Sequence, residues 1–186
     1  GDGGGGDAEL LVEHEHTLRY AWANEALLWA TSCPVVHLAC RSHQIYRALR
    51  TKPRADRLID MVEAVAKHVV EPLRDERRLV LALQLADTLH AAIQRADTKT
   101  LMLVPQVFWS AVSLLASSSA HVFGAALRLL DQLLDRLHLE HRSVRNVLLS
   151  SLPAAWSDAA TAAERAHMFV GIQPLVIVGL MSTRTE

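Results

Sequence analysis

The sequence is poor in residues that break helices. Its 186 residues include only 8 glycines and 6 prolines, and four of the glycines stand together at residues 3–6. Hydrophobic residues make up 51% of the chain. This composition excludes disordered and fibrous proteins. A chain of this length can bury a sizeable core without disulfide bonds.

An excess of charge of either sign is also missing. The 19 Lys and Arg residues and 20 Asp and Glu residues leave a formal net charge of −1. The chain therefore has no global field that would attract nucleic acid or an anionic membrane. Aromatic residues make up only 5% and are not interleaved with the cations. We expect no nucleic-acid partner.

Cysteine is scarce, and the two cysteines are too far apart to pair. Cys33 and Cys40 lie about 10 Å apart along a predicted helix, so we expect free thiols. With His37 and His43 they have the composition of a zinc site. On one helix, however, the four residues spread over about 15 Å, and a single ion cannot reach all of them. A two-ligand site with outside help stays possible, but we expect no metal.

Motifs for catalysis are absent as well. The sequence contains neither Gly-x-Ser-x-Gly nor His-Glu-x-x-His. Asp131 and Asp135 are one turn apart, but Arg128 and Arg136 flank them, which indicates an ion-paired helix face. We therefore expect no enzyme, no cofactor and no small-molecule substrate.

One long segment, residues 100–127, contains no Asp, Glu, Lys or Arg. It exceeds the length of a membrane span. Pro105 and the serines at 117–119 interrupt it, so we predict two buried helices and no membrane insertion.

Helical periodicity fills most of the chain. Residues 1–7 are glycine-rich and predict a flexible linker. Apolar residues at helical spacing then predict about eight helices: Ala8–Thr31, a second that starts at Pro34 and runs to about Leu49, Asp56–Val70, Asp75–Arg95, Leu101–Ala116 (regular only after Pro105), Ala120–Leu139, Ser143–Ser151 and Glu164–Met181.

The first two predicted helices each have an apolar side. In the first, Leu11, Leu18, Trp22 and Trp29 form one apolar stripe. In the second, Leu38, Ser42, Ile45 and Leu49 share one face, and a mixed set lies opposite: Val36, Cys40, His43, Arg47 and Arg50. We expect the apolar side to pack in a layer, with the far edge open to solvent or a partner.

Short links between the helices favour antiparallel hairpins. The hairpins start near residues 8, 54, 101 and 141, a spacing of roughly 40–47 residues that is typical of HEAT and armadillo repeats. We therefore predict an all-α fold in which residues 8–186 form one segment of a larger solenoid; a compact bundle is the alternative. The mean hydropathy of +0.16 fits such a piece, because neighbouring repeats cover the flanks of internal ones.

Basic residues cluster around the turn after the second helix. Two interpretations are open. The cations simply lie in solvent at the helix ends, where they favour the C-terminal end of the second helix, or they form a rim that binds an acidic protein surface or a phosphopeptide. The rim as we define it comprises His43, Arg47, Arg50, Lys52, Arg54 and Arg57.

Five segments carry a resemblance to a known family. The most specific reads ALLWATSCPVVHLACRSHQIYRALRT, residues 26–51. The others follow in the same order as in the family: Pro105–Leu115, Leu127–Leu139, Leu152–Trp156 and Phe169–Thr185. On these motifs the chain resembles the Furry-type cell-morphogenesis proteins, most of all their fungal members. Val36 departs from the pattern, because the family favours a basic residue there.

The resemblance implies a very large, non-enzymatic protein of HEAT/armadillo-like repeats, of which this chain is an internal section. Such proteins act as scaffolds for NDR-family kinases and their MOB co-activators in polarised growth and cell separation, at the cytoplasmic cortex. The resemblance supplies no catalytic residues. A purely structural spacer, a generic HEAT-type adaptor and a metal-dependent enzyme are the alternatives.

Overall fold

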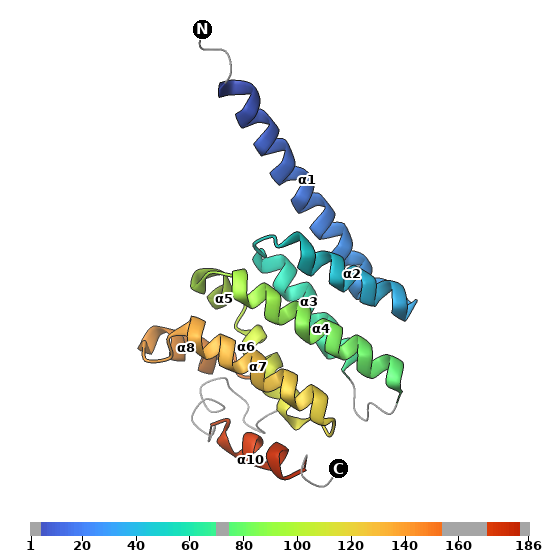
Figure 1. Ribbon diagram of the computed structural model, residues 1–186. Coiled ribbons are helices and arrows are strands. Elements are labelled where there is room, and N and C mark those ends of the chain that lie inside the picture. Colours follow the sequence, from blue (N-terminus) through green and yellow to red (C-terminus); the bar gives the residue numbers. More distant parts are fainter. Residues whose placement is uncertain (1–4, 70–74, 154–170, 183–186) are drawn as a thin grey trace.

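The computed structural model describes residues 5–69, 75–153 and 171–182, and every regular element in these ranges is helical (Figure 1). The all-α prediction is confirmed. The helices are α1 (Gly5–Ser32), α2 (Val36–Leu49), α3 (Ala55–His68), α4 (Glu76–Arg95), α5 (Thr98–Leu103), α6 (Gln106–Ser113), the 3-10 turn η1 (Leu114–Ala116), α7 (Ala120–Leu137), α8 (Arg142–Ser150) and α10 (Gln173–Ser182).

The helices pack as hairpins that stack in two layers. α1 packs on α2, α3 on α4 and α6 on α7. Helices α2, α4 and α7 lie side by side in one layer, and α3 contacts both α1 and α6 in the other (Figure 1). Each hairpin thus rests on the next one along the chain. The arrangement agrees with the predicted stack of helical hairpins.

Most predicted boundaries agree with the structure to within a few residues. α1 begins at Gly5, inside the glycine-rich segment of residues 1–7. α2 begins at Val36, two residues after Pro34. The predicted fifth helix is two helices, because Pro105 separates α5 from α6. The start of the last predicted helix, residues 164–170, lies outside the described residues.

Local chemistry explains several helix ends. The Asp75 carboxylate accepts a hydrogen bond from the Arg77 N–H and caps α4, and the Asp97 carboxylate accepts one from the Thr100 N–H and caps α5. α2 ends at Arg50 in the left-handed conformation, with φ of 52°. A left-handed residue at this position turns the chain out of the helix.

The core is built from leucine, alanine and valine on the central helices. Leu58 and Met61 of α3, Leu89 of α4 and Leu129 of α7 are 0% exposed. The uncharged segment that starts at residue 100 contributes α5, α6, η1 and the start of α7, and most of its large apolar side chains are buried. It forms buried helices, as predicted. None of the described helices has the length and apolar composition of a membrane span.

The predicted apolar stripe of the first helix is not its buried side. Leu18, Trp22 and Trp29 are 57%, 61% and 49% exposed. The buried side of α1 consists of Ala23, Ala26, Leu27 and Ala30. Small side chains let α1 approach its neighbours closely, because the distance between packed helices depends on the residues at the contact.

Most of the predicted apolar face of the second helix is likewise not its buried side, although Leu49 packs against the core. Ala39, His43 and Tyr46 are buried, whereas Leu38 and Ile45 are 42% and 51% exposed. The mixed side, and not the apolar side, therefore packs on α4. The reason is a polar network between α2 and α4.

Candidate protein-binding surfaces

Arg47 connects α2 to α4 through its guanidinium group. Nη1 donates to the Gln84 carbonyl oxygen at 3.0 Å and to the Thr88 hydroxyl at 2.9 Å, and Nη2 donates to Gln84 Oε1 at 2.7 Å. Hydrogen bonds from a charged donor are stronger than neutral ones. We call the group of Arg47, His43, Gln84 and Thr88 the α2–α4 clamp.

His43 lies at the buried end of the clamp and is 1% exposed. Its Nδ1 is 3.0 Å from the Thr88 hydroxyl oxygen. The Thr88 hydroxyl oxygen also lies 2.8 Å from the Gln84 carbonyl oxygen and accepts a hydrogen bond from Arg47. The direction of the His43–Thr88 hydrogen bond follows the tautomer of the imidazole. Burial, with smaller contributions from the charges of Arg47 and His68, lowers the pKa of His43 from 6.5 to about 4.

A further contact secures the end of α2. Arg95 Nη2 donates to the Arg47 carbonyl oxygen at 3.1 Å, in the last turn of α2, where carbonyl groups lack partners within the helix. Burial raises the pKa of the neighbouring Tyr46 to about 12. These contacts hold the first and second hairpins in a fixed relation.

The structure places the six residues of the predicted basic rim in different environments. His43 is buried, and Arg47 is occupied by the α2–α4 clamp, so neither is free to contact a partner. Lys52 pairs with Asp97 at 2.7 Å, Arg54 with Asp56 at 3.4 Å and Arg57 with Asp60 at 2.8 Å.

The ion pairs of Lys52, Arg54 and Arg57 reduce the free positive charge near the turn after α2. Hydrogen bonds from Lys52 and Thr100 hold the pKa of Asp97 below its usual range, so this carboxylate stays charged at a pH where an ordinary aspartate takes up a proton. Within the described ranges, Arg50 is the one member of the rim without a hydrogen bond or ion pair. As a binding surface the rim stays a prediction, for Arg50, Lys52, Arg54 and Arg57.

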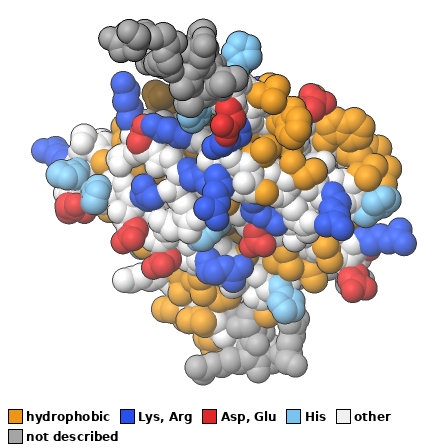
Figure 2. Space-filling view, turned by 45° about the horizontal axis from the view of Figure 1, so that its top comes forward, with side chains coloured by type: hydrophobic (Ala, Val, Ile, Leu, Met, Phe, Trp, Pro, Cys, Tyr) orange, Lys and Arg blue, Asp and Glu red, His pale blue; other side chains and the backbone are white. Residues whose placement is uncertain are grey.

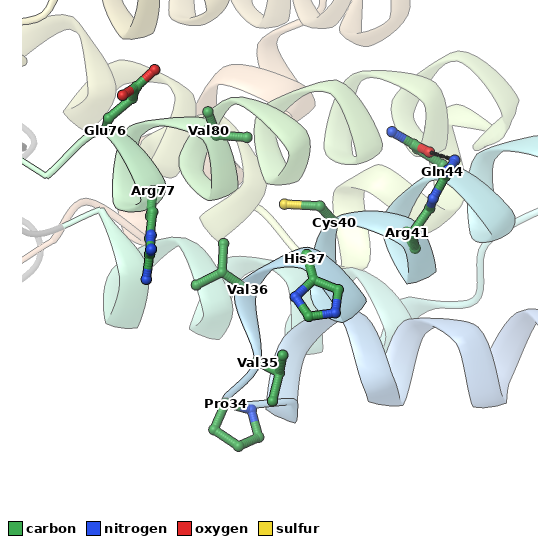
Figure 3. A pocket seen from close by; sticks show the side chains of 10 residues that line it. All are labelled: Pro34, Val35, Val36, His37, Cys40, Arg41, Gln44, Glu76, Arg77 and Val80. Atoms are coloured by element: carbon green, nitrogen blue, oxygen red, sulfur yellow. Dashed lines mark hydrogen bonds between the residues drawn. The ribbon is translucent and has the colours of Figure 1, made fainter.

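A groove of about 710 Å³ opens between the first half of α2 and the first turns of α4 (Figure 3). Sequence reasoning missed it, because its two sides are 40 residues apart in the chain. Apolar side chains line its centre, and polar ones stand around them. The lining residues are Pro34, Val35, Val36, His37, Cys40, Arg41, Gln44, Glu76, Arg77 and Val80.

The two arginines lie at opposite ends of the groove, with Val36, Val80 and Cys40 between them (Figure 3). Arg41 donates to Gln44 Oε1 at 3.1 Å. Neither Arg41 nor Arg77 is in an ion pair with a described carboxylate. Glu76 also lines the groove, but its carboxylate points away from Arg77. The groove therefore offers an apolar centre between two arginines that have no ion-pair partner among the described carboxylates.

The cysteine and histidine residues do not gather into a metal site. His37 and Cys40 both line the groove, His43 faces α4, and Cys33 lies before α2. Burial raises the pKa of the Cys40 thiol, and the charge of Arg47 opposes this shift. Both cysteines are free thiols, as predicted. Across the described residues, no group of three His, Cys, Asp or Glu side chains could hold a metal ion.

The fold defines a class: a stack of paired, antiparallel helices. Comparison with known families adds the identity. The model of the "Cell morphogenesis central region" matches residues 10–75, and that of the "Cell morphogenesis C-terminal" region matches residues 105–186. The chain belongs to the family of Furry-type cell-morphogenesis proteins.

Two relatives support this assignment. The chain is 30% identical to the cell morphogenesis protein PAG1 of Saccharomyces cerevisiae over 164 residues, which are 88% of this chain and 6% of PAG1. It is 24% identical to the cell polarity protein mor2 of Schizosaccharomyces pombe over 179 residues, 95% of this chain and 8% of mor2. The chain thus spans only a small part of either relative. No solved structure matches it.

Proposed function

We propose that this chain is a non-enzymatic scaffold segment of a cell-morphogenesis protein. Its membership of that family is the observation that carries the proposal. In this role it supports signalling by an NDR-family kinase and its MOB co-activator during polarised growth and cell separation. The site of action is the cytoplasmic cortex where growth occurs.

The physical mechanism is co-localisation and orientation. A rigid surface that binds one member of a pair raises its effective concentration near the other. The clamp and the buried core keep the hairpins rigid, so a surface that crosses from α2 to α4 keeps its shape.

The groove between α2 and α4 is the binding surface best suited to this role. An acidic segment with one apolar side chain would place that side chain between Val36 and Val80 and its acidic groups near Arg41 and Arg77. Charge-assisted hydrogen bonds to the two arginines then add affinity and fix the position of the segment along the groove. Arg50 and Arg54 could extend the contact along the rim.

The experiment is a pull-down of purified kinase and co-activator on this chain. We expect the double variant Arg41→Glu, Arg77→Glu to reduce recovery of the partners roughly tenfold or more, because two attractive contacts become repulsive. Arg78→Glu is the matched control: it removes an exposed arginine of the same helix turn that lies outside the groove. Loss of recovery with Arg78→Glu as well would indicate non-specific attraction, and unchanged recovery with the double variant would exclude the groove.

The rim is tested separately with Arg50→Glu, Arg54→Glu. Arg47 is not used, because its substitution would break the α2–α4 clamp and lower the stability of the chain. If recovery of kinase and co-activator is unchanged in this variant, the rim does not bind them.

A structural spacer is the second candidate. The observation that favours it is the large apolar surface on the first hairpin, which suits packing against further helices. A spacer predicts that the full-length protein still binds its kinase after residues 26–139 are deleted, while the distance between its other binding regions changes. A scaffold segment predicts that the deletion removes binding.

A further inference from the structure

A smaller pocket than the groove lies between the end of α3 and the start of α4. It has a volume of about 260 Å³, and its lining residues are Lys67, His68, Arg78 and Leu81. The first two belong to the last turn of α3, and the other two to the first two turns of α4. Three of the four side chains carry a positive charge or can take one up. We call this site the α3–α4 pocket.

The basic side chains of the α3–α4 pocket have no acidic partner among the described residues. Lys67, His68 and Arg78 take part in none of the ion pairs formed there. Leu81, which is 7% exposed, forms a buried apolar wall of the pocket. Charged contacts are stronger where an apolar wall excludes water. The pocket is therefore suited to an anion.

The position of Arg78 also points to a ligand. The C-terminal end of a helix favours cations, so Lys67 and His68 suit the last turn of α3. The first turn of a helix favours acidic groups, and Glu76 follows this rule in α4. Arg77 and Arg78 break it, and each lines a pocket: Arg77 the α2–α4 groove, and Arg78 the α3–α4 pocket. Residues that break a local rule of this kind are expected at functional sites.

The three basic groups match the chemistry of a phosphate monoester. Such a group carries a charge of about −1.5 to −2 at neutral pH and has three strong acceptor oxygens. Lys67 and Arg78 donate to it from two different helices, and His68 adds a third donor when it is protonated. A carboxylate has a single charge and only two oxygens, so it would use the site less fully.

The surroundings favour a phosphorylated side chain over other sources of phosphate. The described lining has no aromatic ring on which a nucleotide base could stack. Anionic membranes attract clusters of roughly 4–8 Lys and Arg residues, more than this pocket holds. Figure 2 shows one face of the molecule, on which Lys and Arg side chains are interspersed with Asp and Glu and form no broad basic area.

We propose that the α3–α4 pocket binds a phosphorylated serine or threonine side chain of a partner protein. Lys67 and Arg78 donate to the phosphate oxygens, and Leu81 contacts the carbon atoms next to the phosphate. The pocket is separate from the α2–α4 groove, and the inference does not depend on which partner the groove binds. Partners without a phosphate group leave the pocket unused, so Arg78→Glu does not affect their binding in the groove.

An NMR titration of the 186-residue chain tests the proposal. The probe is a short peptide with one phosphothreonine between glycine and alanine residues and with both ends blocked, in about 0.15 M salt. The signal is the shift of the His68 ring resonance, which is identified by its loss in His68→Gln. The test variant is Lys67→Met, Arg78→Met. The matched control is Lys99→Met, Arg142→Met, which removes the same two charges at exposed positions outside the pocket. Circular dichroism checks that each variant is folded.

We expect the phosphothreonine peptide to bind saturably, and its affinity to fall roughly tenfold or more in the test variant, because two charge-assisted contacts are lost. The control variant should bind it as the wild-type chain does. A peptide with glutamate in place of phosphothreonine should bind more weakly, because it offers less charge and fewer acceptor oxygens.

Several outcomes would overturn the proposal. The absence of saturable binding is one, and equal loss of affinity in the test and control variants is another, since it would indicate general electrostatic attraction. Equal affinity for the glutamate peptide would contradict recognition of phosphate. Inorganic phosphate that binds as tightly as the peptide would indicate a site for the free ion. Vesicles with phosphorylated lipid headgroups that shift the His68 resonance when the peptide does not would indicate a membrane contact instead.

Discussion

The protonation state of His43 gives the sharpest stability prediction. Its pKa is lowered from 6.5 to about 4 in the folded chain, chiefly by burial. In the pH range between these values, the unfolded chain binds a proton that the folded chain does not. The free energy of unfolding therefore has its full value above pH 6.5 and falls as the pH decreases towards 4. Arg47 and His68, the two charged groups that also lower this pKa, disfavour the imidazolium further.

The magnitude follows from the two pKa values. Each pKa unit corresponds to about 1.4 kcal/mol, so the full effect of His43 is about 3 kcal/mol and roughly 2 kcal/mol is lost by pH 5. The reference is His43→Gln, whose side-chain amide can donate or accept a hydrogen bond at Thr88 but does not titrate. Exposed carboxylates titrate equally in both proteins and cancel in the comparison.

The assay is urea unfolding followed by circular dichroism at pH 7, 6 and 5. We expect the wild-type chain to lose about 2 kcal/mol more than His43→Gln between pH 7 and pH 5. The absolute stability of the variant does not matter, because only its pH dependence is compared. Parallel pH profiles for the two proteins would refute the conclusion that His43 is buried and neutral in the clamp.

Three further stability predictions follow from packing and hydrogen bonding, each measured by chemical denaturation. Arg47→Met should lower the free energy of unfolding by about 2–4 kcal/mol, because the hydrogen bonds of the clamp are lost. Arg50→Met should change it by no more than about 0.5 kcal/mol from the wild-type value. Equal effects of the two substitutions would contradict the clamp. Leu129→Ala, at a fully buried position of α7, should cost about 3–5 kcal/mol, and Leu134→Ala, 40% exposed on the same helix, about 1 kcal/mol or less. Trp109→Phe should cost about 1–3 kcal/mol, because the indole N–H donates to a carbonyl oxygen at the end of α8; a neutral effect would show that this contact does not stabilise the chain.

The sequence alone predicted the helices and their pairing well, because periodicity and breaking residues are local signals. Pro105, for example, divides the predicted fifth helix where the structure does. Periodicity could not identify the buried sides of α1 and α2, because the largest apolar residues of these helices are not the ones that pack. Alanines at 23, 26 and 30 pack instead, and Trp22 and Trp29 face outward.

The candidate site was harder to predict than the fold. The basic residues around the end of α2 form a visible cluster, but Gln84, the partner of Arg47, is 37 residues away in the sequence and Asp97, the partner of Lys52, is 45 residues away. Only the tertiary structure shows that Arg47 is occupied and that Arg41 pairs with none of the carboxylates in the described part of the chain. The groove likewise depends on the meeting of α2 with the start of α4, which no local pattern encodes.

The central claim is that this segment holds a partner of the morphogenesis machinery at the α2–α4 groove. The most direct measurement is site-specific photo-crosslinking in the full-length protein, with a photoreactive side chain in place of Val80 inside the groove or of Leu134 on α7 as the control. In the presence of the kinase and its co-activator, the account predicts a crosslinked product from position 80 and none from position 134. A product from both positions alike, or from neither, would contradict it.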